Sequence, residues 1–465
     1  MKAEIQKGTS LWSDTVSMKE WPRLEGVQGC DVLVIGGGMA GVLTASRLHR
    51  QGVDVVLVDG HRLGSGVTAG TTAKVTSQHG LVYQKLIADI GTEKARMYLD
   101  VNESAVGEYA ELCSSGNSCG FQRKSNLIYS RSGASILEKE MKALEMLNYP
   151  ARLRTNLPLP FETDGAVEFP VQACIHPLQL IRRIAEEDCQ SEEKQRGLRI
   201  FENSRITRLR RWKDGGWEAA ADHGTVLADQ VVVASHFPFL DRRGLYFAKM
   251  HQCKSLVIAG QAPQREPLDG MYMDEAEGGW SFREADNFLL IGGGSGRPGQ
   301  EGITWNDMER AAVTFYPGWE TEYCWSAQDC MTLDGLPYIG TYYGSLQEDV
   351  QDEKVPGIWT ATGFNKWGMT GSMVSAMILS DLICGRKNPY SSLFQPGRSM
   401  LKPQLFANAA ESAKNLLKPK VPRCRHLGCA LHWNDDEKTW DCSCHGSRYD
   451  HAGRCLEGPS TKDLF

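Results

Sequence analysis

Apolar and polar positions follow two different periods along this chain, and the change from one to the other predicts its first elements. The apolar, mainly β-branched run Val32 to Ile35 predicts a strand, and MAGVLTASRLHRQG then has helical spacing and ends at Gly52. A second apolar run ends at Asp59. The order strand, glycine-rich turn, helix, strand is that of a dinucleotide-binding unit.

The turn of this unit carries the glycines that such a ligand requires. Gly36 permits the tight turn, Gly38 lets the backbone approach a pyrophosphate, and Gly41 lets helix and strand pack closely. Asp59, about twenty residues further on, is placed to bond ribose hydroxyls. An accidental glycine-rich turn is disfavoured because both strands, the helix and the acid are present. The motif alone does not separate FAD from NAD.

The middle of the chain alternates predicted helices and strands. Helical spacing is found between Leu81 and Gly116 with Thr92 as a cap, over Ile136 to Leu147 and from His176, and strands are predicted at Asn126 to Ser130, near Val167 and at Val231 to Ala234. The last strand fits a return to the dinucleotide sheet, so the section before it is an insertion. A second glycine cluster, LLIGGGSGRPG, is not interpreted as a nucleotide site, because Pro298 and Gly299 stand where a helix should begin.

Composition limits the possible classes of protein. A chain of 465 residues with 41% hydrophobic residues can form two or three domains, and a net charge of -6 gives no reason to expect nucleic acid. Apolar stretches stay well short of the roughly 18 residues of a membrane span, and we expect a cytoplasmic protein. Fourteen cysteines are present, and five of them fall after Arg423.

These last cysteines lie in two short motifs with histidines, CRHLGC and CSCHGS. Cys424 and His426 form one mixed pair, and Cys442 and His445 form the other. Two thiolates and two imidazoles in paired loops match the ligands of a Rieske 2Fe-2S centre. The alternative is structural zinc, but zinc fingers keep their cysteine pair and histidine pair separate, whereas each pair here is mixed.

Two further stretches are candidates for contact with a flavin. The Gly- and Thr-rich loop Gly64 to Gly80 carries Thr71, Thr72 and Lys74, although a polar loop without a ligand is the alternative interpretation. Between Trp325 and Gly385 a strand, a glycine-rich turn and a helix follow one another. Backbone amides near Gly368, Met369 and Thr370, with Lys366 beside them, are placed to stabilise the N1/O2 side of a reduced flavin ring.

Taken together, the motifs resemble those of a known family. DVLVIGGGMAG, TTAKVTSQHG, QACIHP, WSAQDCMTLDGLPYIG and ATGFNKWGMTGS, which contains Gly363, are similar to the D-amino-acid oxidase and glycine oxidase superfamily, in the bacterial branch with a C-terminal Rieske domain. The resemblance implies FAD, with the first motif on its ADP half and the last over its ring. It also implies a disulfide between Cys429 and Cys444, and a bond from the Ser447 hydroxyl to a bridging sulfide.

The predicted fold class is α/β: a Rossmann-like FAD-binding domain with an inserted α+β substrate domain and a small C-terminal β fragment of Rieske type that binds the cluster. We assign residues 1–90, 171–240 and 325–396 to the FAD-binding domain, and 91–170 and 241–324 to the substrate domain. Residues 397–421 are expected to be a basic linker, since five basic residues and one acid lie between Lys402 and Arg423, and 422–465 the cluster-binding fragment. No strands precede Cys424, so this fragment is expected to depend on its cluster, its disulfide and docking on the flavin domain.

The functional hypothesis is an FAD-dependent dehydrogenase. By resemblance its small substrate is an amine or amino acid oxidised at the C-N bond, and electrons leave through the Rieske centre to an external one-electron acceptor protein or a quinone. One alternative is an oxidase that uses O₂ with a structural or regulatory cluster, and another is a redox-sensing or electron-transfer module without a small substrate. Arg283 is a candidate for binding a substrate carboxylate, although a surface position is the simpler expectation for it.

Overall fold

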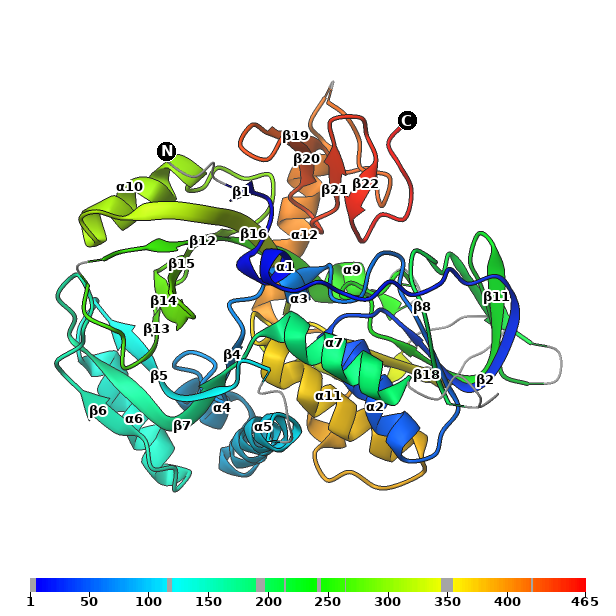
Figure 1. Cartoon of the computed structure of the whole chain (residues 1–465), viewed down its shortest axis with the longest axis horizontal. Coiled ribbons are helices and arrows are strands. Elements are labelled where there is room, and N and C mark those ends of the chain that lie inside the picture. Colours follow the sequence, from blue (N-terminus) through cyan, green and yellow to red (C-terminus); the bar gives the residue numbers. More distant parts are fainter. Residues whose placement is uncertain are drawn as a thin grey trace.

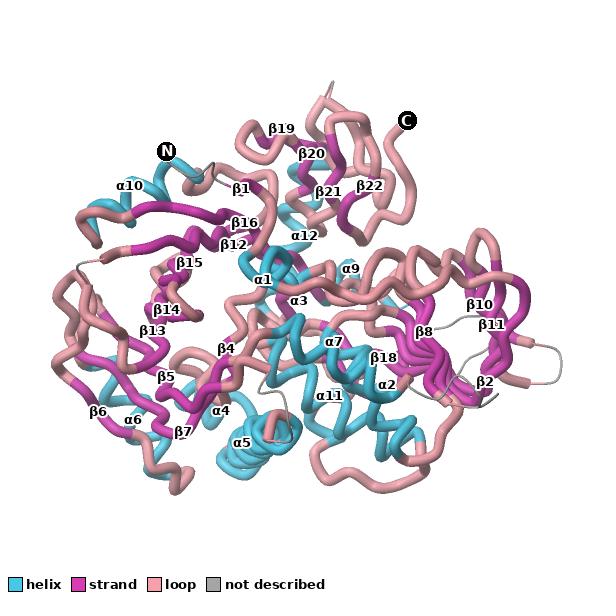
Figure 2. The backbone as a smooth tube through the Cα atoms, viewed as in Figure 1, coloured by secondary structure: helices cyan, strands magenta, loops and turns pink. Residues whose placement is uncertain are grey.

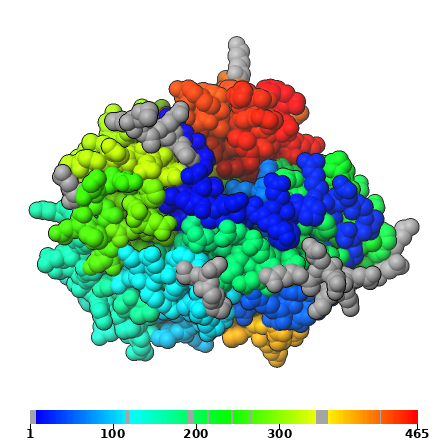
Figure 3. Space-filling model, viewed as in Figure 1, coloured from blue at the N-terminus to red at the C-terminus, as the bar shows by residue number. Residues whose placement is uncertain are grey.

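The computed structural model describes residues 6–114, 119–189, 197–212, 215–240, 244–263, 265–343, 354–419 and 421–465. Within these ranges, two large sheets and a smaller third sheet organise the molecule. Figures 1 and 2 show the large sheets in two lobes side by side, with the C-terminal sheet above their junction. In the space-filling view of Figure 3, the C-terminal segment rests directly on both lobes.

The first large sheet is the dinucleotide-binding unit. Its strand order is β17-β18-β11-β2-β3-β8, with β10 and β9 attached beside β11. The strands are β2 (Gly26–Ile35), β3 (Val55–Val58), β8 (Leu198–Phe201), β9 (Arg208–Arg211), β10 (Trp217–Ala220), β11 (Gly224–Val233), β17 (Tyr338–Tyr343) and β18 (Lys354–Thr362). β11 pairs in parallel with β2, which confirms the predicted return strand. Helix α2 (Met39–Arg50) connects β2 to β3, as the glycine pattern predicts.

The second large sheet has the order β1-β16-β12-β15-β14-β13-β5-β7-β4, with β6 beside β7. Its strands are β1 (Gln6–Lys7), β4 (Lys74–Val75), β5 (Gln122–Ser130), β6 (Arg152–Arg154), β7 (Gly165–Cys174), β12 (Met250–Gln261), β13 (Gly270–Asp274), β14 (Ser281–Ala285), β15 (Phe288–Gly296) and β16 (Glu320–Thr332). The second glycine cluster forms β15, antiparallel to β12 and β14. The interpretation that it forms no nucleotide turn is confirmed.

The predicted domain boundaries do not coincide with the edges of this sheet. The boundary after residue 170 falls within β7, and the boundary after residue 324 falls within β16. β4 was assigned with the FAD-binding domain, yet it pairs with β7. β7 and β16 both belong to the second large sheet, so each of these two boundaries would divide one strand of that sheet.

Helices pack against the sheets and between them. They are α1 (Leu11–Thr15), α3 (Val67–Gly70), α4 (Tyr83–Ile90), α5 (Thr92–Leu112), α6 (Ser135–Met146), α7 (Pro177–Asp188), α9 (Tyr246–Lys249), α10 (Trp305–Phe315), α11 (Gly368–Ile383) and α12 (Pro403–Leu416), with a short 3₁₀ helix at Ser391–Leu393. Gly91, not Thr92, occupies the N-cap of α5. Although α5 was expected in the substrate domain, Tyr109 Oη donates to Met369 O at 2.8 Å, so α5 packs on α11.

The C-terminal sheet has the antiparallel order β19-β20-β21-β22, with strands β19 (Leu431–Asn434), β20 (Thr439–Cys442), β21 (Arg448–Asp450) and β22 (Cys455–Glu457). The predicted linker contains α12, which is packed in place. Asn408 Oδ1 accepts a hydrogen bond from Arg297 Nη2 at 2.5 Å, and Asn415 O accepts one from Ala430 N at 3.1 Å. Among the described helices, we find none with the length and apolarity needed to cross a membrane.

Candidate functional site

The glycine turn after β2 is closed by backbone contacts that leave no room for side chains. Gly36 has φ +112°, and a Cβ there would lie 2.5 Å from Ala234 O. A Cβ on Gly41 would lie 1.8 Å from Gly36 O, so α2 can approach the turn only with glycine at this position. Gly38 is the N-cap of α2 and lines the cavity described below. The helix N-terminus therefore presents free backbone amides to an anion.

Asp59 lies at the end of β3 and organises the same turn. Its Oδ2 accepts a hydrogen bond from Gly37 N at 2.5 Å, and its Oδ1 accepts one from His61 N at 2.6 Å. The carboxylate also lines the cavity. Each oxygen can accept a further bond, so ribose hydroxyls can be bound here without loss of the turn.

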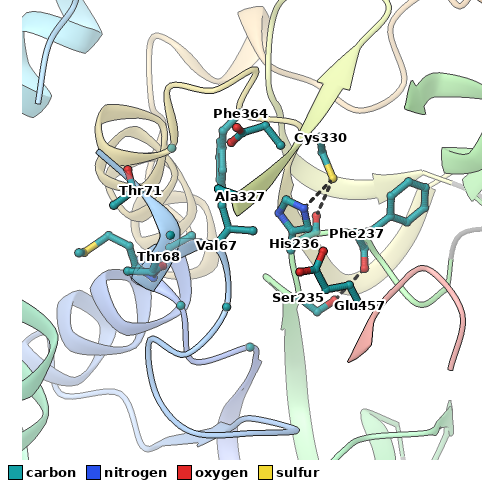
Figure 4. Close-up of a pocket in the computed structure, with 18 of the residues that line it drawn as sticks. Val67, Thr68, Thr71, Ser235, His236, Phe237, Ala327, Cys330, Phe364 and Glu457 are labelled. Atoms are coloured by element: carbon teal, nitrogen blue, oxygen red, sulfur yellow. Dashed lines mark hydrogen bonds between the residues drawn. The ribbon is translucent and has the colours of Figure 1, made fainter. Parts of the chain in front are cut away.

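A cavity of about 420 Å³ runs from this turn along the junction of the two large sheets. Nine of the residues predicted to contact FAD line it, namely Gly36, Gly38, Asp59, Thr71, Thr72, Lys74, Lys366, Gly368 and Met369. Figure 4 shows Val67, Thr68 and Thr71 on one side of the cavity, with His236 and Glu457 on the other. An elongated cavity between the N-termini of two helices fits a dinucleotide whose two halves differ in charge.

Three predicted residues stand behind this wall and support it. Gly41 packs on the turn, and Gly363 has φ +72°, where an added Cβ would lie 2.3 Å from Thr332 Cγ2. Thr370 Oγ1 lies 2.9 Å from His79 Nε2 and donates to Thr76 O at 3.1 Å. His79 is thus a buried structural histidine, as its sequence context suggested, and burial lowers its pKa to about 3.

The two lysines of the cavity are held in place by hydrogen bonds. Lys366 Nζ donates to Ser295 Oγ at 2.6 Å, close to the N-terminus of α11. Lys74 Nζ donates to Tyr272 O at 2.8 Å and to Ser281 Oγ at 2.6 Å. Burial, together with the positive charge of the neighbouring Arg283, lowers the pKa of Lys74 to about 7. Lys366 is therefore the candidate cation for stabilising charge on a reduced flavin ring, whereas the lowered pKa of Lys74 leaves part of it as a neutral amine near pH 7.

Arg283 is not on the surface, so the simpler expectation for it was wrong. The residue is 4% exposed, and its guanidinium donates to Thr72 O, to Ile175 O at 3.0 Å and to Glu284 O at 3.2 Å. The same group lies 5.1 Å from the centroid of the Trp12 ring. Arg283 is absent from the cavity lining in the described residues. Its donors hold the backbone around the Thr-rich loop, and we do not assign a substrate carboxylate to it.

The ionisable residues of the cavity that the sequence did not indicate include His236, Asp329 and Glu457. His236 Nε2 lies 3.4 Å from Cys330 Sγ, and burial lowers the pKa of this histidine to about 4. Burial raises the pKa of Asp329 to about 6, against the opposing charge of Lys366. Glu457 comes from the C-terminal sheet and ion-pairs with Arg448 at 3.3 Å. No sequence motif signals these residues, because only the fold brings the three segments together.

The two cysteine and histidine loops have the same backbone design. Cys424 O accepts from Gly428 N at 2.9 Å, and Cys442 O accepts from Gly446 N at 2.9 Å. Each loop is closed by a second bond of 2.9 Å, from Cys424 N to Cys429 O and from Cys442 N to Ser447 O. Both glycines have positive φ, +79° and +85°. The chain therefore builds two matching turns that bring one Cys and one His each to a common centre.

The side chains at this centre are buried and close together. Sγ atoms of Cys429, Cys442 and Cys444 lie within 4.8 Å of one another, and the rings of His426 and His445 have centroids 5.0 Å apart at 89°. Cys424 Sγ lies 3.4 Å from Tyr449 Oη. The group of three sulfur atoms contains one predicted ligand, Cys442. Two thiols and two imidazoles are the donors that a Rieske cluster needs, and all four predicted ligands are buried. Cys429 and Cys444 are free thiols in this structure, so their disulfide stays a prediction.

The predicted docking of this module on the flavin-domain lobes is observed. Gln328 Nε2 donates to Gly446 O at 3.1 Å, and Gln252 Nε2 donates to Gly458 O at 3.1 Å. Both histidine rings contact phenylalanines of the flavin-domain lobes. The ring centroid of His426 lies 6.4 Å from that of Phe237, and the ring centroid of His445 lies 6.2 Å from that of Phe247. Residues 456–461 form one wall of the cavity.

A family model described as FAD dependent oxidoreductase matches residues 31–382. The chain belongs to this FAD-dependent oxidoreductase family. A second model, for the Rieske 2Fe-2S domain, matches residues 417–465. The chain is thus an FAD-dependent oxidoreductase of amino-acid oxidase type with a Rieske domain, and its cofactors are FAD and a 2Fe-2S cluster. The zinc alternative for the C-terminal pattern is not supported.

Known proteins share this arrangement in whole or in part. "Putative Rieske 2Fe-2S iron-sulfur protein YhfW" of Bacillus subtilis (strain 168) is 30% identical over 98% of this chain and 96% of its own length. Glycine oxidase from Geobacillus kaustophilus superposes with a TM-score of 0.63 at 18% identity, covering 80% of this chain and 99% of that one. L-Amino acid deaminase from Proteus vulgaris, lacking its specific insertion sequence, gives 0.62 at 17% identity over 83% and 97%. The two solved structures share the fold of the oxidoreductase part.

Proposed function

We propose that this chain is a dehydrogenase that oxidises the C-N bond of an amine or amino acid and releases the electrons singly to an external acceptor. FAD, when bound, accepts a hydride, and the 2Fe-2S cluster passes electrons one at a time. The observation that carries the proposal is the position of the Rieske loops. They dock on a pair of strands whose opposite face lines the FAD cavity.

These two strands, β12 and β16, separate the two cofactor sites. In their antiparallel ladder Lys254 is opposite Gln328, and Cys253 is opposite Asp329. Neighbouring residues of a strand point to opposite faces. Asp329 lines the cavity, whereas Gln328 contacts Gly446 in the second cluster loop. The thickness of one sheet therefore lies between the cavity and the cluster loops, which supports electron transfer within the chain.

Ion pairs hold the Rieske module against this ladder. Lys254 Nζ pairs with Glu437 and lies 3.7 Å from Asp441 Oδ2. Arg448 links the same acids, at 3.1 Å from Glu437 and 3.1 Å from Asp441. Buried pairs of this kind fix a geometry more than they add stability. A fixed docking suits electron transfer, because the rate of transfer depends on the distance between donor and acceptor.

The substrate class rests on the relatives and on the cavity. The glycine oxidase and the L-amino acid deaminase named above share the fold of this part of the chain. Within the described residues, Lys74 and Ser281 form a polar site on the substrate-domain sheet, beside Met273 and Gly292. A basic Lys74 amine is well placed to receive a proton from a substrate ammonium group, which must lose it before hydride transfer. We therefore favour amines and amino acids over alcohols.

The first test is anaerobic. Iron and flavin are quantified on the purified protein, and electron paramagnetic resonance is recorded after reduction with dithionite. About two irons per flavin and a Rieske signal of low average g are expected. A panel of amines and amino acids is then mixed with the oxidised protein, and flavin bleaching is followed together with the growth of the Rieske signal.

The outcomes separate the candidate functions. Flavin bleaching followed by cluster reduction supports the dehydrogenase. Flavin bleaching with stoichiometric peroxide in air and a cluster that stays oxidised would show an oxidase instead. A flavin that no amine reduces, but that a reduced carrier protein reduces rapidly, would refute the assignment to amine oxidation.

A further inference from the structure

The histidine side of the cluster site faces inward, and this leaves a different side for the external acceptor. His426 is 7% exposed and His445 is 4% exposed, and both rings face phenylalanines of the flavin-domain lobes. The first cluster loop, in contrast, reaches the surface between its ligands, where Arg425 is exposed between Cys424 and His426. An acceptor that docks on the intact molecule therefore meets the first loop and its surroundings.

These surroundings form one continuous surface, which we call the basic surface. Its members are Lys414, Leu416, Leu417 and Lys418 from the end of α12, with Arg423 and Arg425 from the first loop. Arg423 joins the two segments, since its Nη1 donates to Leu416 O at 3.1 Å and to Gly428 O at 3.2 Å. Leu417 is 82% exposed and Leu416 is 47% exposed.

This surface carries positively charged side chains, whereas the net charge of the whole chain is negative. The protein carries 57 acidic and 51 basic residues, a net charge of -6. Glu411 lies on the same stretch of α12 and interacts electrostatically with Lys414. Glu411 Oε1 accepts from Asn415 Nδ2 at 2.7 Å, and Asp463 Oδ1 accepts from Cys455 N at 2.7 Å. Exposed leucines ringed by cations have the anatomy of a protein docking site, with an apolar centre and a charged rim.

We propose that the basic surface is the docking site of an acidic one-electron carrier protein, to which the first cluster loop delivers electrons. This inference rests on the proposed exit of electrons through the Rieske centre. Carboxylates around the redox centre of the carrier would pair with the lysines and arginines, and an apolar patch would cover Leu416 and Leu417. Electrostatic steering of this kind raises association rates and fades with salt. None of the described residues of the basic surface lines the FAD cavity.

The test uses the full holoprotein reduced with dithionite, so that neither an amine nor the flavin is needed to load electrons. Three oxidants are compared in stopped flow: plastocyanin as an acidic copper protein, mitochondrial cytochrome c as a basic haem protein, and a neutral water-soluble quinone. For each electron lost by the protein, one Cu(II) of plastocyanin becomes Cu(I), without proton transfer. We expect plastocyanin to react fastest. Its rate constant should fall at least about fivefold between roughly 10 and 200 mM salt, because salt screens the charge pairs between the two proteins.

Variants locate the site. The double reversal Lys414→Glu with Lys418→Glu should slow the reduction of plastocyanin by about tenfold at low salt. Lys94→Glu with Lys139→Glu, on exposed positions of α5 and α6, is the matched control and should change it less than twofold. Leu417→Ser tests the apolar centre. Calorimetric binding of redox-inert zinc plastocyanin gives a readout that does not depend on turnover, and an unchanged Rieske signal shows that the cluster is intact.

Two results would overturn the inference. One is a charge reversal that leaves the rate of plastocyanin reduction unchanged. The other is that cytochrome c or the quinone oxidises the wild type and every variant faster than plastocyanin does. Failure of all amines to reduce the flavin would instead refute the proposed function and leave this docking test unaffected.

Discussion

Gln328 of the oxidoreductase part donates through Nε2 to Gly446 O at 3.1 Å, and so joins the wall of the FAD cavity to the second cluster loop. The same amide nitrogen contacts Gln252 Oε1 at 2.8 Å and the carboxylate of Glu457. Gln328 is 1% exposed. One buried side chain thus links both strands of the wall to the two segments of the Rieske module that face them.

Gln328→Met keeps the volume of this side chain but removes its donors. The partner carbonyl and carboxylate then lose a bond inside the interface, at a cost of about 1–3 kcal/mol. We expect slower electron transfer from flavin to cluster and faster hydrogen exchange of the amides in residues 442–447. Gln261→Met, at the exposed end of the neighbouring strand β12, where Gln261 bonds Glu322 of β16, is the control and should change neither quantity. Equal exchange in both variants would contradict the role given to Gln328.

The two cluster loops allow a matched comparison of glycines. Gly428 and Gly446 have nearly the same positive φ, but a Cβ on Gly428 meets nothing within 4 Å, whereas one on Gly446 would lie 2.6 Å from Gln252. Gly428→Ala should therefore cost only backbone strain, about 1 kcal/mol. Gly446→Ala must also push the module away from β12. We expect a lower iron content and looser docking for Gly446→Ala alone, measured as iron per flavin and as protease sensitivity of the module.

A second pair of glycines tests the nucleotide turn. Gly41→Ala places a methyl group 1.8 Å from Gly36 O, so the N-terminus of α2 must shift. Its backbone N-H groups then no longer point toward the phosphate position. At least a tenfold loss of FAD affinity is expected, with a destabilisation of about 1–3 kcal/mol. Gly107→Ala in α5 meets nothing within 4 Å and should stabilise the helix by about 0.5–1 kcal/mol. Normal flavin content in purified Gly41→Ala protein would argue against the turn as the phosphate site.

The outcome at these positions shows what a sequence can and cannot reveal. Glycines of the turn and the four cluster ligands follow local rules, since each motif is contained in one short segment whose spacing fixes its geometry. Asp329, His236 and Glu457 meet only after three distant segments fold together. The domain limits stay a prediction, and two of them fall within the strands β7 and β16, whose pairing is not visible in the local sequence.

Arg283 illustrates the same limit in a single side chain. Alternation along β14 places it on the face of Ser281, but which groups cover that face depends on Trp12 and on the loop at Thr72. As an anchor of buried carbonyls, Arg283→Met should lower the free energy of unfolding by about 3 kcal/mol and reduce flavin retention. Arg310→Met, on an exposed arginine of α10, is the control. A large rise in KM for amino acids over simple amines, at unchanged stability, would restore a role in carboxylate binding.

Asp329 gives the molecule a predictable dependence on pH. Burial raises its pKa in the folded protein to about 6, above the value of roughly 3.9 in an unfolded chain. Between these values the folded state binds more protons, so stability falls as the pH rises through this window, and the full cost remains above pH 6. Asp329→Asn removes the charge and should stabilise the flavin-free protein by up to about 3 kcal/mol at pH 8, but by only about half as much at pH 5. Denaturant unfolding at both pH values measures this difference.

Asp307→Asn is the control and should have the opposite effect on stability. The Thr304 hydroxyl and backbone N-H lower the pKa of Asp307, so loss of this carboxylate should destabilise the protein at pH 8. An Asp329→Asn protein no more stable than the wild type at pH 8 would mean that Lys366 fully compensates the buried carboxylate.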